Sequence, residues 1–223
     1  MGSSQPALRA WAGLDPAQES YGRERTCNLN PAFELAYWYW ALNIAQTWRE
    51  RLGLARDPQW EQVLQQLSVP TVRKGVYTAI ETPPYTILRD HPSMVAAWGV
   101  VPPTPLIDPQ VMRHTLDRVL RTWDWPTTWG WDYPMLAMTA ARLGRPEQAV
   151  DALFIESAKN RYLANGHNYQ STRLPLYLPG NGGLLAAVAM MAAGWDGCPD
   201  SPAPGFPDDG QWHVRWEGLK RTP

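Results

Sequence analysis

The sequence contains few of the residues and patterns that mark a disulfide-rich, membrane-spanning or nucleic-acid-binding protein. Its 223 residues include two cysteines, Cys27 and Cys198, which are too few for a disulfide framework or a zinc site. Lys and Arg number 20 against 21 Asp and Glu, so the chain lacks the basic excess that nucleic acids and anionic membranes attract. The longest strongly apolar run, 184–193, has about half of the ~20 residues that cross a bilayer. We therefore expect neither nucleic acid nor membrane as a partner.

Charged residues are also scarce, at 18%, whereas hydrophobic residues reach 44%, a balance typical of a globular chain with a core. The aromatic content is unusual, because 13 Trp and 9 Tyr stand beside 3 Phe. Trp and Tyr combine a flat apolar face with a polar tip, which suits a sugar ring. Carbohydrate is therefore the first candidate ligand, and the alternative is that the indoles fill a helical core.

Hydrophobic periodicity predicts a mainly helical fold. Apolar residues recur at steps of three and four in several segments, and Asn30, Asp108 and Pro109 are suited to helix starts. Gly144 separates two of the helices and predicts a helical hairpin. The predicted helices cover the ranges 31–52, 59–67, 109–123, 133–143, 146–156 and 184–191.

The connections between these helices are long and rich in Pro, Trp and Tyr, at roughly 70–108, 122–131 and 157–182. Long connections without regular structure tend to carry function, so we expect the site there. The strict alternation of residues over 212–217 predicts a half-buried strand near the C-terminal end.

Glu19 is the candidate general acid. It precedes the first predicted helix and lies close in sequence to Tyr21 and Trp11. Glycoside hydrolysis needs a carboxylic acid whose pKa is raised by apolar or like-charged neighbours, so that it can protonate the leaving oxygen. The alternative interpretation is that Glu19 is an ordinary surface residue.

Two further segments combine carboxylates with a histidine or with aromatics. Asp90 and His91 end a long loop, where the histidine can orient a substrate hydroxyl or a carboxylate, or simply bond to backbone. Trp129, Trp131 and Asp132 belong to a cluster of five aromatics and two carboxylates within eleven residues. Such a cluster is suited to stacking a pyranose ring while a carboxylate binds its hydroxyls, although Asp132 is also a candidate helix cap.

His167 and Asn181 complete the candidate site residues, in the segments 165–169 and 178–183. The second segment is rich in glycine but lacks the spacing, Lys and Ser/Thr of a phosphate-binding loop, so its glycines are interpreted as allowing close backbone approach. The four histidines have no ligand-like spacing, and no Gly-x-Ser-x-Gly motif is present. We expect no metal and no cofactor.

Taken in order, these segments resemble the second half of the catalytic domain of six-hairpin, (α/α)6-barrel glycosidases, nearest to the alpha-L-fucosidase family of that group. Met94 replaces a histidine of those enzymes, and Pro179 stands where they keep the aspartate that completes the base side of their mechanism. The stretches that carry the resemblance are Pro16-Ala17-Gln18-Glu19, His91-Pro92-Ser93-Met94-Val95, Gly130-Trp131-Asp132, Ala141-Arg142-Leu143-Gly144 and Pro179-Gly180-Asn181-Gly182-Gly183.

The resemblance implies an all-α fold: a single domain over 1–223, made of the helical hairpins of an incomplete (α/α)6 barrel with a small C-terminal β element. A full barrel has twelve helices and about six are predicted here, so the chain resembles the C-terminal half of a larger catalytic domain. An incomplete barrel exposes an apolar inner face, which predicts self-association or a missing N-terminal half as partner.

The resemblance also implies a glycoside hydrolase of the inverting type, acting on a carbohydrate substrate with Glu19 as general acid. Asp132 is the first candidate for the base and Asp90 the second. The alternatives are a truncated noncatalytic carbohydrate-binding or structural module, and a glycoside phosphorylase on the same fold. The loops that carry the substrate-binding candidates are expected to converge on one face with the carboxylates. Those candidates are Trp129, Trp131, His91, His167 and Asn181.

Overall fold

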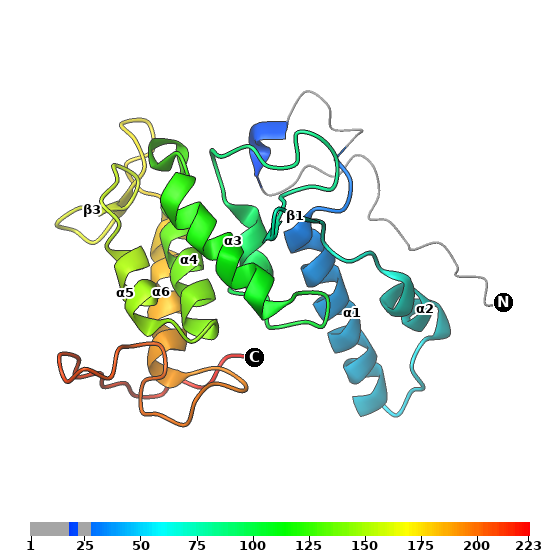
Figure 1. Ribbon diagram of the computed structural model, residues 1–223. Helices are drawn as coiled ribbons and strands as arrows, with labels where there is room; N and C mark the ends of the chain where they lie inside the picture. The colour runs from blue at the N-terminus through cyan, green and yellow to red at the C-terminus, as the bar shows by residue number, and fades with distance from the viewer. Residues whose placement is uncertain (1–17, 22–27) are drawn as a thin grey trace.

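Six α-helices provide most of the regular structure of residues 18–21 and 28–223, the part of the chain that a computed structural model describes (Figure 1). They are α1 (Ala32–Arg51), α2 (Pro58–Gln66), α3 (Pro109–Thr122), α4 (Asp132–Arg142), α5 (Pro146–Leu153) and α6 (Leu178–Ala193). Short 3-10 helices are η1 (Glu19–Tyr21), η3 (Ser93–Ala97) and η4 (Trp125–Thr127). Two antiparallel strand pairs join β1 (Val72–Arg73) to β2 (Val76–Tyr77) and β3 (Arg161–Tyr162) to β4 (Asn168–Tyr169). The prediction of a mainly helical fold is confirmed.

The helix starts show how local sequence fixes the elements. The Asp108 carboxylate accepts hydrogen bonds from the backbone N–H of Gln110 and Val111 at 2.7 and 3.0 Å, and Pro109 takes the first helical position of α3. The predicted cap of α1 is wrong, because the Asn30 side-chain amide donates to Glu81 instead and Asn30 itself has a φ of 47°. Pro31 occupies the cap position without a side-chain hydrogen bond.

Helix α6 begins six residues before the predicted start at 184, so the glycines lie inside the helix, and the close approach expected of them is confirmed at Gly180 and Gly183. Close packing explains their presence inside a helix. A Cβ on Gly180 would lie 2.3 Å from Asn168 Oδ1, and a Cβ on Gly183 would lie 2.9 Å from Pro134 Cγ. The tertiary contacts therefore outweigh the low helix propensity of glycine.

The prediction of a strand at 212–217 is wrong, because these residues form no strand and no sheet extends into the tail of the described chain. Trp212 packs on Phe206 with ring centroids 5.4 Å apart, and no ladder hydrogen bonds join this stretch to a neighbour among the described residues. A single alternating segment needs a partner strand to form a sheet. The nearest approach to a β element is an isolated parallel bridge between Trp195 and Thr222.

Helix α4 is the centre of the core. It packs against α5, α6 and η3, and its residues 132–137 are all buried. Helices α1 and α2 lie at one edge of the molecule and α5 and α6 at the other, with α3 and α4 between them (Figure 1). Within the described ranges, no helix is long and apolar enough to cross a membrane. The start of α4 and the loop before it contact the other loops that carry candidate site residues, because Asp132 contacts His91 and Gly130 contacts Gln170.

Candidate active site

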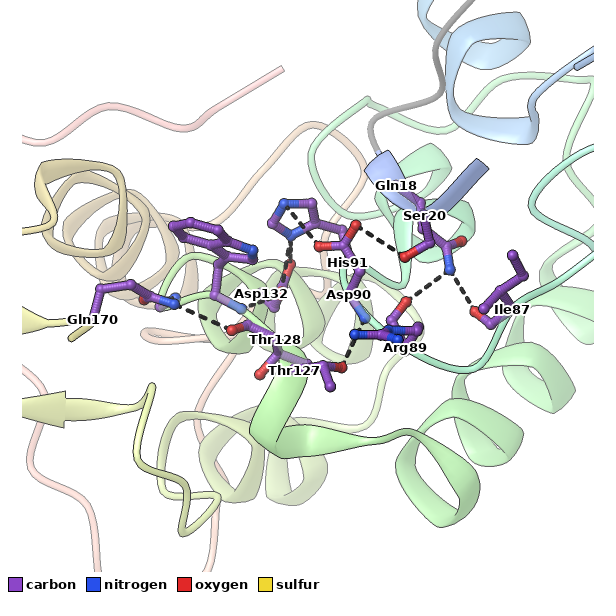
Figure 2. A network of polar contacts seen from close by, with 12 residues as sticks. Gln18, Ser20, Ile87, Arg89, Asp90, His91, Thr127, Thr128, Asp132 and Gln170 are labelled. Atoms are coloured by element: carbon purple, nitrogen blue, oxygen red, sulfur yellow. Dashed lines mark hydrogen bonds and ion pairs between the residues drawn. The ribbon is translucent and has the colours of Figure 1, made fainter. Parts of the chain in front are cut away.

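A buried histidine–aspartate pair forms the centre of the candidate site. His91 Nδ1 lies 2.9 Å and 3.1 Å from the two carboxylate oxygens of Asp132, the first residue of α4 (Figure 2). Asp132 is fully buried, and its Oδ2 also accepts a hydrogen bond of 2.8 Å from the Trp129 backbone N–H. Trp131, not Asp132, occupies the cap position of α4. The Asp132 carboxylate thus ties the histidine to the aromatic loop.

The protonation of His91 reflects two opposing influences. Burial lowers its pKa, while the hydrogen bond that His91 donates to Asp132 and the negative charges of Asp132, Asp90 and Glu19 raise it. The raising influences prevail, so the pKa of His91 lies above its usual value. The His91 side chain is therefore protonated to a greater extent in this site than a free histidine side chain is in water at the same pH.

Asp90 adds a second carboxylate. Its Oδ1 lies 3.5 Å from His91 Nε2, and its Oδ2 accepts a hydrogen bond of 3.4 Å from the Ser20 hydroxyl (Figure 2). The residue has a φ of 62°, a conformation that non-glycine residues rarely adopt. Two hydrogen bonds hold it there: its N–H donates to Thr127 Oγ1 at 2.9 Å, and its carbonyl accepts from Trp123 Nε1 at 2.7 Å.

Glu19 lies in η1, which is fastened to the loop before Asp90. The buried Gln18 amide donates to the carbonyl oxygens of Ile87 and Arg89, the latter at 2.8 Å (Figure 2). The Glu19 side chain is exposed, yet its charge contributes to raising the pKa of His91 and of Tyr177. Glu19 is therefore within electrostatic range of the pair. Trp11 and the segment 16–17 lie outside the described residues.

Aromatic side chains line the approach to His91. The Trp131 and Trp129 rings have centroids 4.7 Å and 6.1 Å from the imidazole, and Tyr177 lies 5.4 Å from Trp129. Both tryptophans are half-buried, as expected of residues that line a site. Burial, together with the charges of the three carboxylates, raises the pKa of Tyr177. Lys159 Nζ lies 5.9 Å from the centroid of Trp129.

Two buried amide side chains hold the loop that carries the tryptophans. Gln170 accepts from the Gly130 N–H at 3.0 Å and donates to the Thr128 carbonyl at 3.2 Å (Figure 2). Asn168 packs against Gly130 so closely that a Cβ there would lie 1.9 Å from Asn168 Oδ1. Sequence reasoning missed Gln170, Tyr177 and Lys159. Their position in the long connection at 157–182, which was expected to carry function, is the one feature of the sequence that could have indicated them.

His167 and Asn181 lie elsewhere in the structure. Asn181 accepts from the Asn168 N–H at 2.9 Å and donates to the Gly166 carbonyl at 2.7 Å, so it fastens the β3–β4 hairpin to α6. His167 Nδ1 lies 3.2 Å from the Asn165 side-chain amide within that hairpin. Across the described chain, no hydrogen bond or ion pair joins either residue to the His91–Asp132 pair. The structure thus brings together Asp90, Asp132, His91 and the two tryptophans, with Glu19 linked to them through its charge alone, while His167 and Asn181 shape the hairpin.

No group of three or more His, Cys, Asp or Glu side chains within 18–21 and 28–223 is arranged to hold a metal ion. No protein-family model matches this chain, and no curated protein matches it either. The case for a function therefore depends on the residues of this site and on the resemblance noted in the sequence.

Proposed function

We propose that this chain is part of a glycoside hydrolase that cleaves a carbohydrate substrate with inversion at the anomeric carbon. The observation that carries the proposal is the meeting of Trp129 and Trp131 with the Asp90 and Asp132 carboxylates around one histidine, on which the charge of Glu19 also acts. A sugar ring offers an apolar face for stacking and hydroxyls for carboxylates, so this combination suits it. The resemblance to six-hairpin glycosidases supports the same reaction class.

In this proposal Glu19 is the general acid, since it is an exposed carboxylate of η1 whose charge contributes to raising the pKa of His91. Asp90 takes the role of base in place of Asp132. Asp132 has no exposed surface and both of its oxygens bond to His91, whereas Asp90 retains 9% exposure and one oxygen that contacts only the Ser20 hydroxyl among the described residues. Asp132 then positions His91. Inversion requires a water between acid and base, with the carboxyl groups ~6.5 to 9.5 Å apart.

A panel of aryl glycosides tests the proposal. We expect Glu19→Gln to lower turnover by about 10²- to 10⁴-fold on substrates with poor leaving groups and by much less on activated ones, because an activated leaving group needs no protonation. Asp90→Asn is expected to lower turnover for both kinds. Glu217→Gln, an exposed carboxylate in the tail, is the matched control and is expected to change nothing. Full activity of Glu19→Gln would contradict the acid assignment, and a retained anomer seen by proton NMR would contradict inversion.

Phosphorolysis is the second candidate, because Lys159 brings a cation to the edge of the aromatic site, 5.9 Å from the Trp129 ring. In that reaction phosphate replaces the activated water and a carboxylate base is not needed. Measuring turnover with and without phosphate separates the two reactions. Sugar binding without turnover in either condition would identify a noncatalytic carbohydrate-binding module instead.

A further inference from the structure

A separate cavity of about 290 Å³ lies where the β1–β2 hairpin and the loop after it meet α3. Three cationic side chains line it: Arg73, Lys74 and Arg118. No acidic side chain lines it, and none of the three cations forms an ion pair within the described chain. Trp123 forms part of the wall, and its Nε1 donates to the Asp90 carbonyl, so the cavity is a neighbour of the candidate active site and does not include its carboxylates.

The local fold holds these cations in place. Lys74 and Gly75 have φ values of 51° and 76°, as in a two-residue type I′ hairpin turn, and both Arg73, which precedes the turn, and Lys74 within it line the cavity. The Arg73 guanidinium lies 3.9 Å from the centroid of the Tyr85 ring, a cation–π contact. The hairpin is also fixed to α3, which carries Arg118, because the Tyr77 N–H donates to Thr115 Oγ1 at 2.9 Å.

The rest of the lining combines apolar and hydroxyl groups. Met94, Val119 and Trp123 are buried and provide an apolar floor, while Thr86 contributes a hydroxyl that accepts from the Ala79 N–H at 3.1 Å and keeps its own O–H to donate. A volume near 290 Å³ is at the small end of ligand sites, which suits a single ring with one substituent. The three cations favour a ligand with negative charge, and the apolar floor favours a ligand that contains a ring.

We propose that this cavity binds the phosphate monoester of a small ring compound, such as a sugar phosphate. A monoester carries up to two negative charges near neutral pH and has three acceptor oxygens, which match three cations better than a single carboxylate does. Guanidinium groups also form paired hydrogen bonds to phosphate oxygens. The ring lies on the apolar floor. This proposal does not depend on the glycosidase proposal, because it uses a different cavity and a binding readout.

Isothermal titration calorimetry of the full chain with glucose 6-phosphate tests it. We expect one binding site and an affinity that falls as salt increases, because the attraction is between charges. Inorganic phosphate is expected to bind more weakly, since it lacks the ring, and glucose is expected not to bind. Glucose 6-sulfate, with one negative charge, is expected to be weaker than the phosphate. Absence of glucose 6-phosphate binding, or equal binding of glucose, would overturn the proposal.

Two variants locate the site. Arg118→Gln is expected to weaken binding of glucose 6-phosphate by about tenfold or more, since it removes a charge-assisted hydrogen bond. Lys74→Asn removes the charge at a residue whose positive φ asparagine tolerates, and is expected to weaken binding in the same direction. Arg121→Gln is the control, because Arg121 is exposed on the same helix and does not line the cavity. An equal loss of affinity in the control would show a nonspecific charge effect and overturn the proposed site.

Discussion

Asp132 illustrates how a single buried carboxylate organises its surroundings. It contacts His91 through both oxygens and the Trp129 N–H through one, with no surface exposed to solvent. A buried charge is tolerated when it is paired and hydrogen-bonded, and removing its partners leaves a large desolvation cost. The pair therefore couples the protonation of His91 to the position of the aromatic loop.

Asp132→Asn tests this coupling. The substitution removes the negative charge and weakens the hydrogen bond that raises the pKa of His91, while the burial that lowers this pKa stays. We expect the pKa of His91 to fall, measured by NMR titration of its ring carbons, and the free energy of unfolding to decrease by about 1 to 3 kcal/mol. Asp124→Asn, at an exposed carboxylate, is the control. An unchanged His91 titration would show that Asp132 does not set this pKa.

The pH dependence of stability provides a second test at the residue scale. Because folding raises the pKa of His91, the folded state binds this proton more tightly than the unfolded state does. The resulting stabilisation is fully present below the unfolded pKa of about 6.5 and is lost as pH rises through the folded pKa. We expect urea unfolding at a series of pH values to show this loss in the wild type and a smaller one in His91→Gln. Identical pH profiles would contradict it.

At the scale of elements, the loop 128–131 is held by contacts from the β4 region rather than by its own sequence. Gln170 accepts from the Gly130 N–H and donates to the Thr128 carbonyl, and Asn168 occupies the space where a Cβ on Gly130 would be. Gly130 is thus fixed by a neighbour 38 positions later in the chain, a contact that nothing in the local sequence indicates.

Gly130→Ala is expected to be destabilising, because its Cβ would lie 1.9 Å from Asn168 Oδ1. The expected loss is about 1 to 3 kcal/mol of unfolding free energy, typical of overpacking. Gly182→Ala in α6 is the matched control: its Cβ meets no atom within 4 Å, so it should be neutral or stabilising by about 0.5 to 1 kcal/mol, as alanine favours a helix. Chemical denaturation measures both. Equal effects of the two substitutions would rule out the steric explanation.

The same elements show what could be predicted from the sequence. The start of α3 follows from Asp108 and Pro109, since a cap and a first-turn proline act locally. The start of α6 could not be predicted, because its glycines are explained by packing against Asn168 and Pro134. The strand predicted at 212–217 failed for a related reason: alternation describes a strand only where a partner strand is present.

For the molecule as a whole, α1 shows the limit of periodicity. Its apolar spacing predicted the helix correctly, but it did not show which side faces the core. Leu35 and Ala36 are buried, whereas Tyr37, Trp38 and Trp48 are 45%, 50% and 56% exposed. Similarly, the loops that carry the site residues were predicted as functional from their composition, while the contact of His91 with Asp132 links residues 41 positions apart and needed the fold.

The exposed aromatics of α1 lead to a prediction about assembly. Large apolar side chains exposed along one helix favour association with another apolar surface. We expect sedimentation velocity to show association that increases with protein concentration. The double variant Trp38→Glu, Trp48→Glu is expected to shift the protein to monomer, because charge on this face opposes burial. Trp216→Glu is the control, since Trp216 has a similar exposed fraction, 46%, but lies in the C-terminal tail and not in α1. A wild-type chain that stays monomeric at every concentration would contradict self-association through this face. A control that dissociates the assembly as well as the double variant would place the interface elsewhere on the molecule.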